Sequence, residues 1–263
     1  MTKTIFDFLP LWFFYFSIPL ILLLAFEAGY KISKNIPSST GKDTFDSVSP
    51  MVSGLLAMLA FVLALTFSMA FTQHNLRMKN VLHDAEVIGT AYLRADSLNE
   101  QDKIKVKQLL KKYVDTLVHA VEEASTKEMK AMLEKSQEIH HLLWSLSISA
   151  MNREPTLQKG LLLQSINEVI DSQQKRISSG LYNRIPNSVW LILLAISILT
   201  MMTMGSQAKL IQSRRMTAII PLILAFTALT TTIMDLDRPK EGMIIIGQEA
   251  MLDLQKSLEM KPQ

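Results

Sequence analysis

Charged side chains at the ends of apolar segments are the residues of this chain best suited to chemistry. Asp235, Asp237 and Arg238 end one apolar segment, and Arg184 stands just before another. An arginine beside carboxylates at this depth has two interpretations. It fixes two helix ends in a network, or it contributes to a ring of charge at a pore mouth or to a cation site. The sequence favours the first interpretation and leaves the second open.

Four more charged residues follow another apolar segment and are expected within reach of the same membrane interface. They are Asp84, Glu86, Arg94 and Asp96. Most charges of this kind lie on solvated helix faces and contribute little to stability. Together with the first group they form a candidate interfacial charge network. One hypothesis is that Arg94 or Asp96 pairs with a charge of the first group in another copy of the chain, with Asp237 or Arg184.

Small side chains recur every three or four residues along the second apolar segment. The residues that share this helical face are Ser53, Ala57, Ala60, Ala64, Ser68 and Thr72. Such a face lets a neighbouring helix approach closely, which is the first interpretation of the pattern alone. The second interpretation is that copies of this face line the axial pore of an oligomer, where small and hydroxyl side chains leave a weakly polar path.

Motifs for enzymatic or metal chemistry are missing from the sequence. The chain has no cysteine, and none of its five histidines stands in an H-E-x-x-H or similar spacing. Neither a glycine-rich phosphate loop nor a G-x-S-x-G motif occurs. We therefore predict no catalytic residue, no metal site and no cofactor. The net charge of +3 comes from scattered Lys and Arg, which argues against a nucleic-acid partner.

Four apolar segments must position the residues named above. They occupy 9–28, 51–71, 188–204 and 216–234, and each is close to the roughly 20 residues that cross a bilayer as a helix. Charged residues make up 19% of the chain, below the roughly 25% typical of soluble domains. The predicted fold is an all-α membrane protein with four transmembrane helices.

The polar segment between the second and third apolar segments is predicted to form amphipathic helices, the first continuous with the second span. Asn99 is expected to cap the next helix, Ser125 begins a capping-box pattern, and residues 152–155 separate two helices. This predicts a helical-bundle soluble domain inserted between two transmembrane pairs.

The predicted domain boundaries follow from these segments. The first transmembrane pair is 1–72, the soluble domain 73–187, the second pair 188–234, and a C-terminal tail that packs on the soluble domain 235–263. The orientation has two interpretations. The basic residues of the short loop at 206–215 favour a cytoplasmic loop and an extracytoplasmic domain, whereas the total count of basic residues favours the reverse.

Three sequence blocks resemble the bestrophin-like family of bacterial membrane proteins. They are the segment 84–96 (DAEVIGTAYLRAD) after the run ALTFSMAF, the segment Arg184-Ile185-Pro186 with Trp190, and the segment 235–239 (DLDRP) with Gly242. In this order they cover roughly residues 50–255. Bestrophins are pentameric anion channels with cytosolic helical domains. The dense acidic cluster of the bestrophin calcium clasp is not evident here, so calcium gating through that device is not implied.

The resemblance implies a homo-oligomeric ion channel in the bacterial inner membrane, a pentamer with its soluble domain in the cytosol. Its pore is then lined by the second transmembrane helix, and its partners are itself, the lipid bilayer and inorganic ions. The alternative is a membrane-anchored sensor or scaffold without ion conduction. A membrane enzyme is the least supported class, because the chain offers no recognisable set of catalytic groups.

Overall fold

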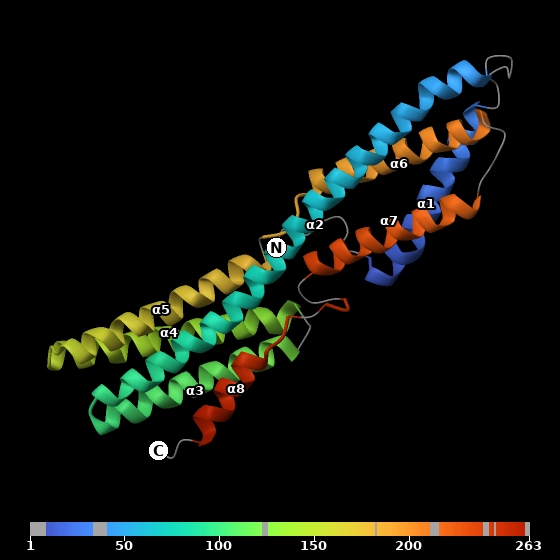
Figure 1. The fold of residues 1–263 in the computed structure, drawn as a ribbon. Coiled ribbons are helices and arrows are strands. Elements are labelled where there is room, and N and C mark those ends of the chain that lie inside the picture. The colour runs from blue at the N-terminus through green and yellow to red at the C-terminus, as the bar shows by residue number, and fades with distance from the viewer. Residues whose placement is uncertain are drawn as a thin grey trace. The chain divides into compact units, whose positions relative to one another are not determined.

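The computed structural model describes residues 9–33, 41–122, 126–181, 183–210, 216–238, 242–244 and 246–260. Its elements are α1 (Leu11–Ile32), α2 (Gly41–Arg94), the 3-10 turn η4 (Ala95–Ser97), α3 (Glu100–Glu122), α4 (Thr126–Arg153), α5 (Leu157–Leu181), α6 (Asn187–Leu210), α7 (Met216–Asp237) and α8 (Glu249–Met260) (Figure 1). No strand occurs in these described residues, which confirms the predicted all-α class. Ser125 and the end of the 206–215 loop, beyond Leu210, lie outside them.

Four of the described helices contain stretches long and apolar enough to cross a bilayer. These stretches lie within Leu11–Ile32, Ser49–Ser97, Asn187–Lys209 and Ile219–Asp237. Each overlaps one apolar segment of the sequence. The second belongs to α2, a single helix of 54 residues, about 80 Å long at the rise of an α-helix. The predicted continuity of the second apolar segment with the first polar helix is therefore confirmed.

The chain divides into two compact units. The apolar unit comprises Met1–His74 and Asn183–Ile245, and the polar unit comprises Asn75–Tyr182 and Ile246–Gln263. Helix α2 contributes its first part to the apolar unit and its last part to the polar unit. Helices α1, α6 and α7 belong to the apolar unit, whereas α3, α4, α5 and α8 belong to the polar unit.

Helices α1 and α6 of the apolar unit approach each other closely at two glycines. A Cβ atom built on Gly29 would lie 1.9 Å from the carbonyl oxygen of Met202, and one on Gly205 would lie 2.0 Å from that of Phe26. Ser206 also donates a hydrogen bond of 3.1 Å to the Gly29 carbonyl oxygen. Small residues at such a crossing let backbones pack directly, as is common between helices in membranes.

The polar unit is built around one apolar core. Fully buried side chains come from each helix that contributes to it: Ile88 of α2, Tyr113 of α3, Leu143 of α4, Ile166 of α5 and Met251 of α8. Helix α8 packs along α3, where Gln255 Nε2 donates to Asp115 Oδ1 over 2.7 Å. Since each amphipathic helix has one apolar stripe, packing the stripes together removes them from water.

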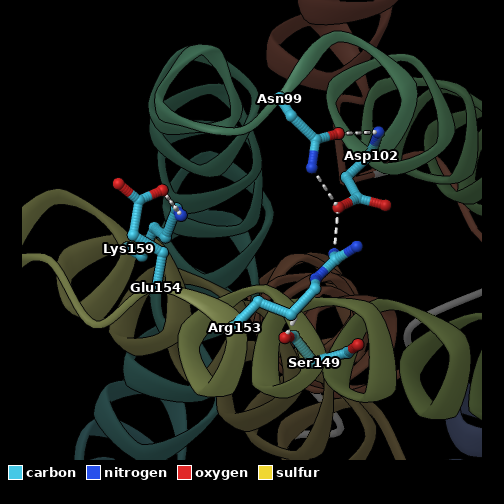
Figure 2. Close-up of polar contacts among 6 residues, drawn as sticks. All are labelled: Asn99, Asp102, Ser149, Arg153, Glu154 and Lys159. Atoms are coloured by element: carbon cyan, nitrogen blue, oxygen red, sulfur yellow. Dashed lines mark hydrogen bonds and ion pairs between the residues drawn. The ribbon is translucent and has the colours of Figure 1, made fainter.

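Asn99 caps α3, as the sequence predicts. Its Oδ1 atom accepts a hydrogen bond of 2.9 Å from the backbone N–H of Asp102, and its Nδ2 atom donates over 2.9 Å to the Asp102 carboxylate (Figure 2). The same carboxylate accepts from Arg153 at the end of α4. After the predicted helix break, Lys159 Nζ pairs with Glu154 over 2.7 Å. The Asp102–Arg153 pair joins the start of α3 to the end of α4, and the Lys159–Glu154 pair bridges the turn between α4 and α5.

Candidate functional site

The small-residue face of α2 is exposed over its whole length. Its members Ser53, Ala57, Ala60, Ala64, Ser68 and Thr72 all lie on the surface of the chain. The side of α2 that packs within the apolar unit is different and includes Leu59, Leu63 and Ala70, which join a core with Trp190 and Leu193 of α6. The chain's own packing therefore uses a separate stripe of α2 and leaves the small face uncovered.

Hydroxyl groups on α2 are satisfied by the helix itself. Ser53 Oγ donates to the Ser49 carbonyl oxygen over 3.2 Å, and Thr72 Oγ1 donates to that of Ser68 over 2.8 Å. A hydroxyl group that gives its proton to the preceding turn keeps its oxygen lone pairs available. At these two positions the face therefore offers weak hydrogen-bond acceptors and no unpaired donor.

The small-residue face of α2 ends at a pocket of about 200 Å³, on the side of the polar part of this helix. The pocket is lined by Ser68, Met69, Thr72, Gln73, Arg184 and Ile185. Two members of the predicted pore-lining set thus meet Arg184 of the predicted charge network. Gln73, which the sequence pattern did not single out, contributes a buried Oε1 atom with no hydrogen-bond partner among the described residues. Its amide group adds a polar wall to this pocket.

Arg184 and Asp237 are paired, in agreement with the favoured interpretation of these charges. Arg184 Nε donates to Asp237 Oδ2 over 2.9 Å, and the backbone N–H of Ile185 donates to Oδ1 over 3.0 Å. Asp237 is only 2% exposed. Its carboxylate therefore fastens the segment before α6 to the end of α7.

Asp235 holds the chain that leaves α7. Both of its oxygens lie within hydrogen-bond distance of the Met243 backbone N–H, at 3.1 and 3.0 Å. Gly242 has a φ of 128°, and a Cβ atom there would lie 1.5 Å from Asp235 Oδ1. Only glycine suits this position, because it must both adopt a positive φ and leave room for the carboxylate.

Arg238 connects the end of α7 to the beginning of α1. Its Nη2 atom donates to the Leu9 carbonyl oxygen over 3.0 Å, and its guanidinium lies 5.4 Å from the centre of the Phe14 ring. The three charged residues Asp235, Asp237 and Arg238 thus bind three different segments of the apolar unit. Their arrangement fixes helix ends, which is what a rigid membrane frame requires.

The other four residues of the predicted network lie in the polar unit and find their contacts there. Asp84 pairs with Arg176 (Oδ2 to Nε, 3.1 Å), and Arg94 Nη1 donates to Ser165 Oγ over 2.6 Å. Asp96 accepts from Lys107 Nζ over 2.5 Å on the surface. Glu86 is exposed, with His83 Nδ1 3.9 Å away. Pairing of Arg94 or Asp96 with another copy of the chain stays a prediction.

Metal-binding side chains do not gather in the described part of the chain. No group of three or more His, Asp or Glu side chains that could hold an ion is found there. His140 is the most unusual of the histidines, because burial lowers its pKa to about 4. It lies in the core of the polar unit, with its ring centre 4.8 Å from that of Tyr113.

Comparison with known proteins adds an independent line of evidence. A model of the bestrophin-like domain matches residues 20–251. Two crystal structures of a bacterial bestrophin homolog from Klebsiella pneumoniae, each with a different single mutation, share the fold. One gives a TM-score of 0.55 at 13% identity over 95% of this chain and 99% of that chain, and the other gives 0.56 at 13% identity over 94% and 97%. No curated protein sequence matches the chain.

Proposed function

The chain belongs to the bestrophin-like family, and on this premise we propose that it forms a homo-oligomeric ion channel. The observation that carries the proposal is the exposed small-residue face of α2. Helix α2 packs against its own chain through one stripe and presents small and hydroxyl side chains on another. Such a helix is suited to line the central pore of an oligomer. In a single copy this face has no such pore, so the function needs several copies.

The four apolar helices are proposed to be transmembrane, with the polar unit as a soluble domain inserted between the second and third. The described helices have the length and composition that this arrangement requires. Two aromatic residues at the start of α1 support it, because Trp12 and Tyr15 are both exposed and these residue types favour the membrane interface. The proposed domains are 1–72, 73–187, 188–234 and 235–263.

The proposed location is the inner membrane of a bacterium, with the soluble domain in the cytosol. The proposed number of subunits is five, as in bestrophins. In this arrangement the pocket at Ser68, Thr72 and Arg184 lies where the pore-lining face ends. Ions that travel along the face pass this pocket on their way to or from the polar part of α2. Lipid contacts the remaining apolar surfaces, which are exposed in the single chain.

Ion flux through purified protein in liposomes tests the proposal, with anion and cation gradients applied separately. Ala64→Phe places a ring on the proposed pore face and is expected to abolish the flux. Ala225→Phe is the matched control, since Ala225 is also an exposed alanine of an apolar helix, in α7, but lies outside the proposed pore. Equal flux from both variants rejects the α2 face as the pore lining, and no flux from a well-folded wild-type oligomer rejects the channel.

A membrane-anchored sensor or scaffold is the second candidate function. One observation favours it: α2 is a single helix that passes through both units, so it is suited to carry a displacement from one to the other. This function requires no ion flux and does not depend on the size of residue 64. An oligomer that conducts no ion, but binds a protein through its polar unit, would support it instead of the channel.

A further inference from the structure

The core of the polar unit contains a group of polar side chains that its apolar surroundings do not explain. One lies on each of the four longest helices of this unit: Asp84 on α2, Tyr113 on α3, His140 on α4 and Gln173 on α5. Their exposed fractions are 1%, 0%, 6% and 4%. We call these four residues the polar centre. Polar groups buried this deeply ordinarily have hydrogen-bond partners.

Each member of the polar centre nevertheless carries an unsatisfied atom. Both carboxylate oxygens of Asp84, the hydroxyl of Tyr113, Nε2 of His140 and Nε2 of Gln173 lack a hydrogen-bond partner among the described residues. Arg176 balances the Asp84 charge as an ion pair at 3.1 Å, but its Nε–H is not aligned for a hydrogen bond. The nearby Ser172 hydroxyl donates to the Val169 carbonyl oxygen instead.

Several of these groups are close enough to act on one another. The Tyr113 and His140 rings are in edge-to-face contact at 4.8 Å. Burial raises the pKa of Tyr113, and the charges of Arg176 and Asp84 both reach its hydroxyl group. The Arg176 charge also reaches His140. The unsatisfied atoms of Asp84, Tyr113 and His140 therefore belong to one region of the bundle, and Gln173 stands three residues before Arg176 on α5, on the same side of that helix.

We propose that the polar centre is a binding site for ordered water, enclosed by α2, α3, α4 and α5. A water molecule donates two hydrogen bonds and accepts two, so it can satisfy the Asp84 carboxylate and His140 Nε2 as acceptors and accept from Tyr113 or Gln173. The Asp84–Arg176 pair leaves no net charge for an ion to balance. A metal ion is also unsuitable, because only Asp84 and His140 in the polar centre are common metal ligands.

This inference does not depend on the proposed channel, because it concerns the polar unit alone. The polar centre joins four helices that share one apolar core, with polar contacts such as Arg94–Ser165 and Asp102–Arg153 elsewhere between them. Apolar contacts are non-directional, whereas hydrogen bonds through water would add a directional restraint on helix register, since each helix contributes a polar atom to the site. The water site would then select one packing of the bundle among several of similar apolar burial.

Substitution of Tyr113 tests the proposal by the sign of its effect. If water satisfies the hydroxyl, Tyr113→Phe breaks a hydrogen bond and lowers the melting temperature of the full-length protein by about 2–4 °C. If the hydroxyl is unsatisfied in a dry core, its removal raises the melting temperature. Tyr92→Phe is the matched control, because Tyr92 is also a buried tyrosine of this unit but its hydroxyl is not among the unsatisfied atoms.

A structure of the full-length protein that resolves ordered water provides the second measurement. Density for water in hydrogen-bond contact with Asp84 and Tyr113, lost in Tyr113→Phe, is the expected result. Two outcomes overturn the proposal: a melting temperature that is unchanged or raised in Tyr113→Phe, and a Tyr113 hydroxyl that bonds directly to Asp84 with no water between them.

Discussion

Asp237 and Arg184 are joined by a hydrogen bond of 2.9 Å between Oδ2 and Nε, and the second oxygen of the same carboxylate accepts from the backbone of Ile185. One side chain at the end of α7 therefore holds both a charged partner and a backbone segment. Since Asp237 is buried, loss of either contact weakens the compensation of its buried charge.

Asp237→Ala is expected to destabilise the protein by about 3–5 kcal/mol, because it removes one partner of a buried ion pair. Thermal unfolding of the purified protein measures the loss. Arg184→Asp and Asp237→Arg should each be destabilising, and the double variant should be less destabilised than the sum of the two, by about 1.5–3 kcal/mol. Additive losses would show that the pair contributes no coupling energy.

Asp253→Ala provides the control for this pair. Asp253 is 79% exposed in α8, and its nearest basic atom, Lys256 Nζ, is 4.0 Å away. Exposed pairs at this spacing contribute little, so the variant should unfold at the wild-type temperature. A loss as large as that of Asp237→Ala would mean that removal of any carboxylate destabilises the protein.

Gly242→Ala is expected to destabilise the exit from α7. The φ of 128° is strained for an L-residue, and the new methyl group would collide with the Asp235 carboxylate. Strain of this kind costs about 1–3 kcal/mol, to which the displaced carboxylate adds. Gly180→Ala, in α5 with no atom within 4 Å of the new methyl group, should be stabilising by about 0.5–1 kcal/mol. Equal effects in thermal unfolding would contradict the assigned geometry.

Gly29→Ala and Gly205→Ala are expected to separate α1 from α6. Each new Cβ atom would overlap a backbone carbonyl, which cannot turn away as a flexible side chain can. Overpacking of this kind costs about 1–3 kcal/mol or more per site. The fraction of protein that stays folded after heating, measured by size-exclusion chromatography, reports the effect. Wild-type heat resistance in both variants would show that the helices separate without cost.

Much of the helical architecture could be predicted from the sequence, because it follows from local patterns. The length of apolar segments sets the four long apolar helices, and the side-chain cap of Asn99 marks the start of α3. The sequence also favoured a contact between Arg184 and the carboxylates at the end of α7, because charged groups beside apolar segments need partners, but it did not select Asp237 over Asp235.

Features that depend on tertiary packing were missed. The stripe of α2 that packs within the chain includes Leu59 and Leu63 and differs from the small-residue face. The sequence of one helix does not reveal which of its sides contacts which neighbouring helix. Gly29 and Gly205 are distant in sequence and meet only when α1 and α6 cross. The polar centre combines residues from four helices. Only Asp84 belonged to the predicted charge network, because the sequence pattern does not distinguish Tyr113, His140 and Gln173 from ordinary residues of amphipathic helices.

The stability of the protein is expected to fall as the pH is lowered from 6.5 towards 4, and His140 should be one cause. Burial is the main cause that lowers the pKa of His140 from 6.5 to about 4, and the positive charges of Arg176 and His141 lower it further. The other titratable groups of the polar centre are Tyr113 of α3 and Asp84 of α2. Above pH 6.5 the imidazole is neutral in both the folded and the unfolded protein, so its protonation does not change the free energy of unfolding. Between the two values only the unfolded chain takes up the proton, so unfolding is favoured by as much as about 3 kcal/mol.

His140→Gln removes this titration and should flatten the pH dependence of the melting temperature between pH 6.5 and 4.5, whatever its effect at neutral pH. His83→Gln is the control, because the His83 side chain is 47% exposed and its replacement should leave the wild-type slope. Carboxylates that titrate in the same range affect wild type and variants alike, so the difference in slope isolates His140. A slope in His140→Gln equal to that of wild type would show that the imidazole takes up its proton in the folded protein as readily as in the unfolded chain.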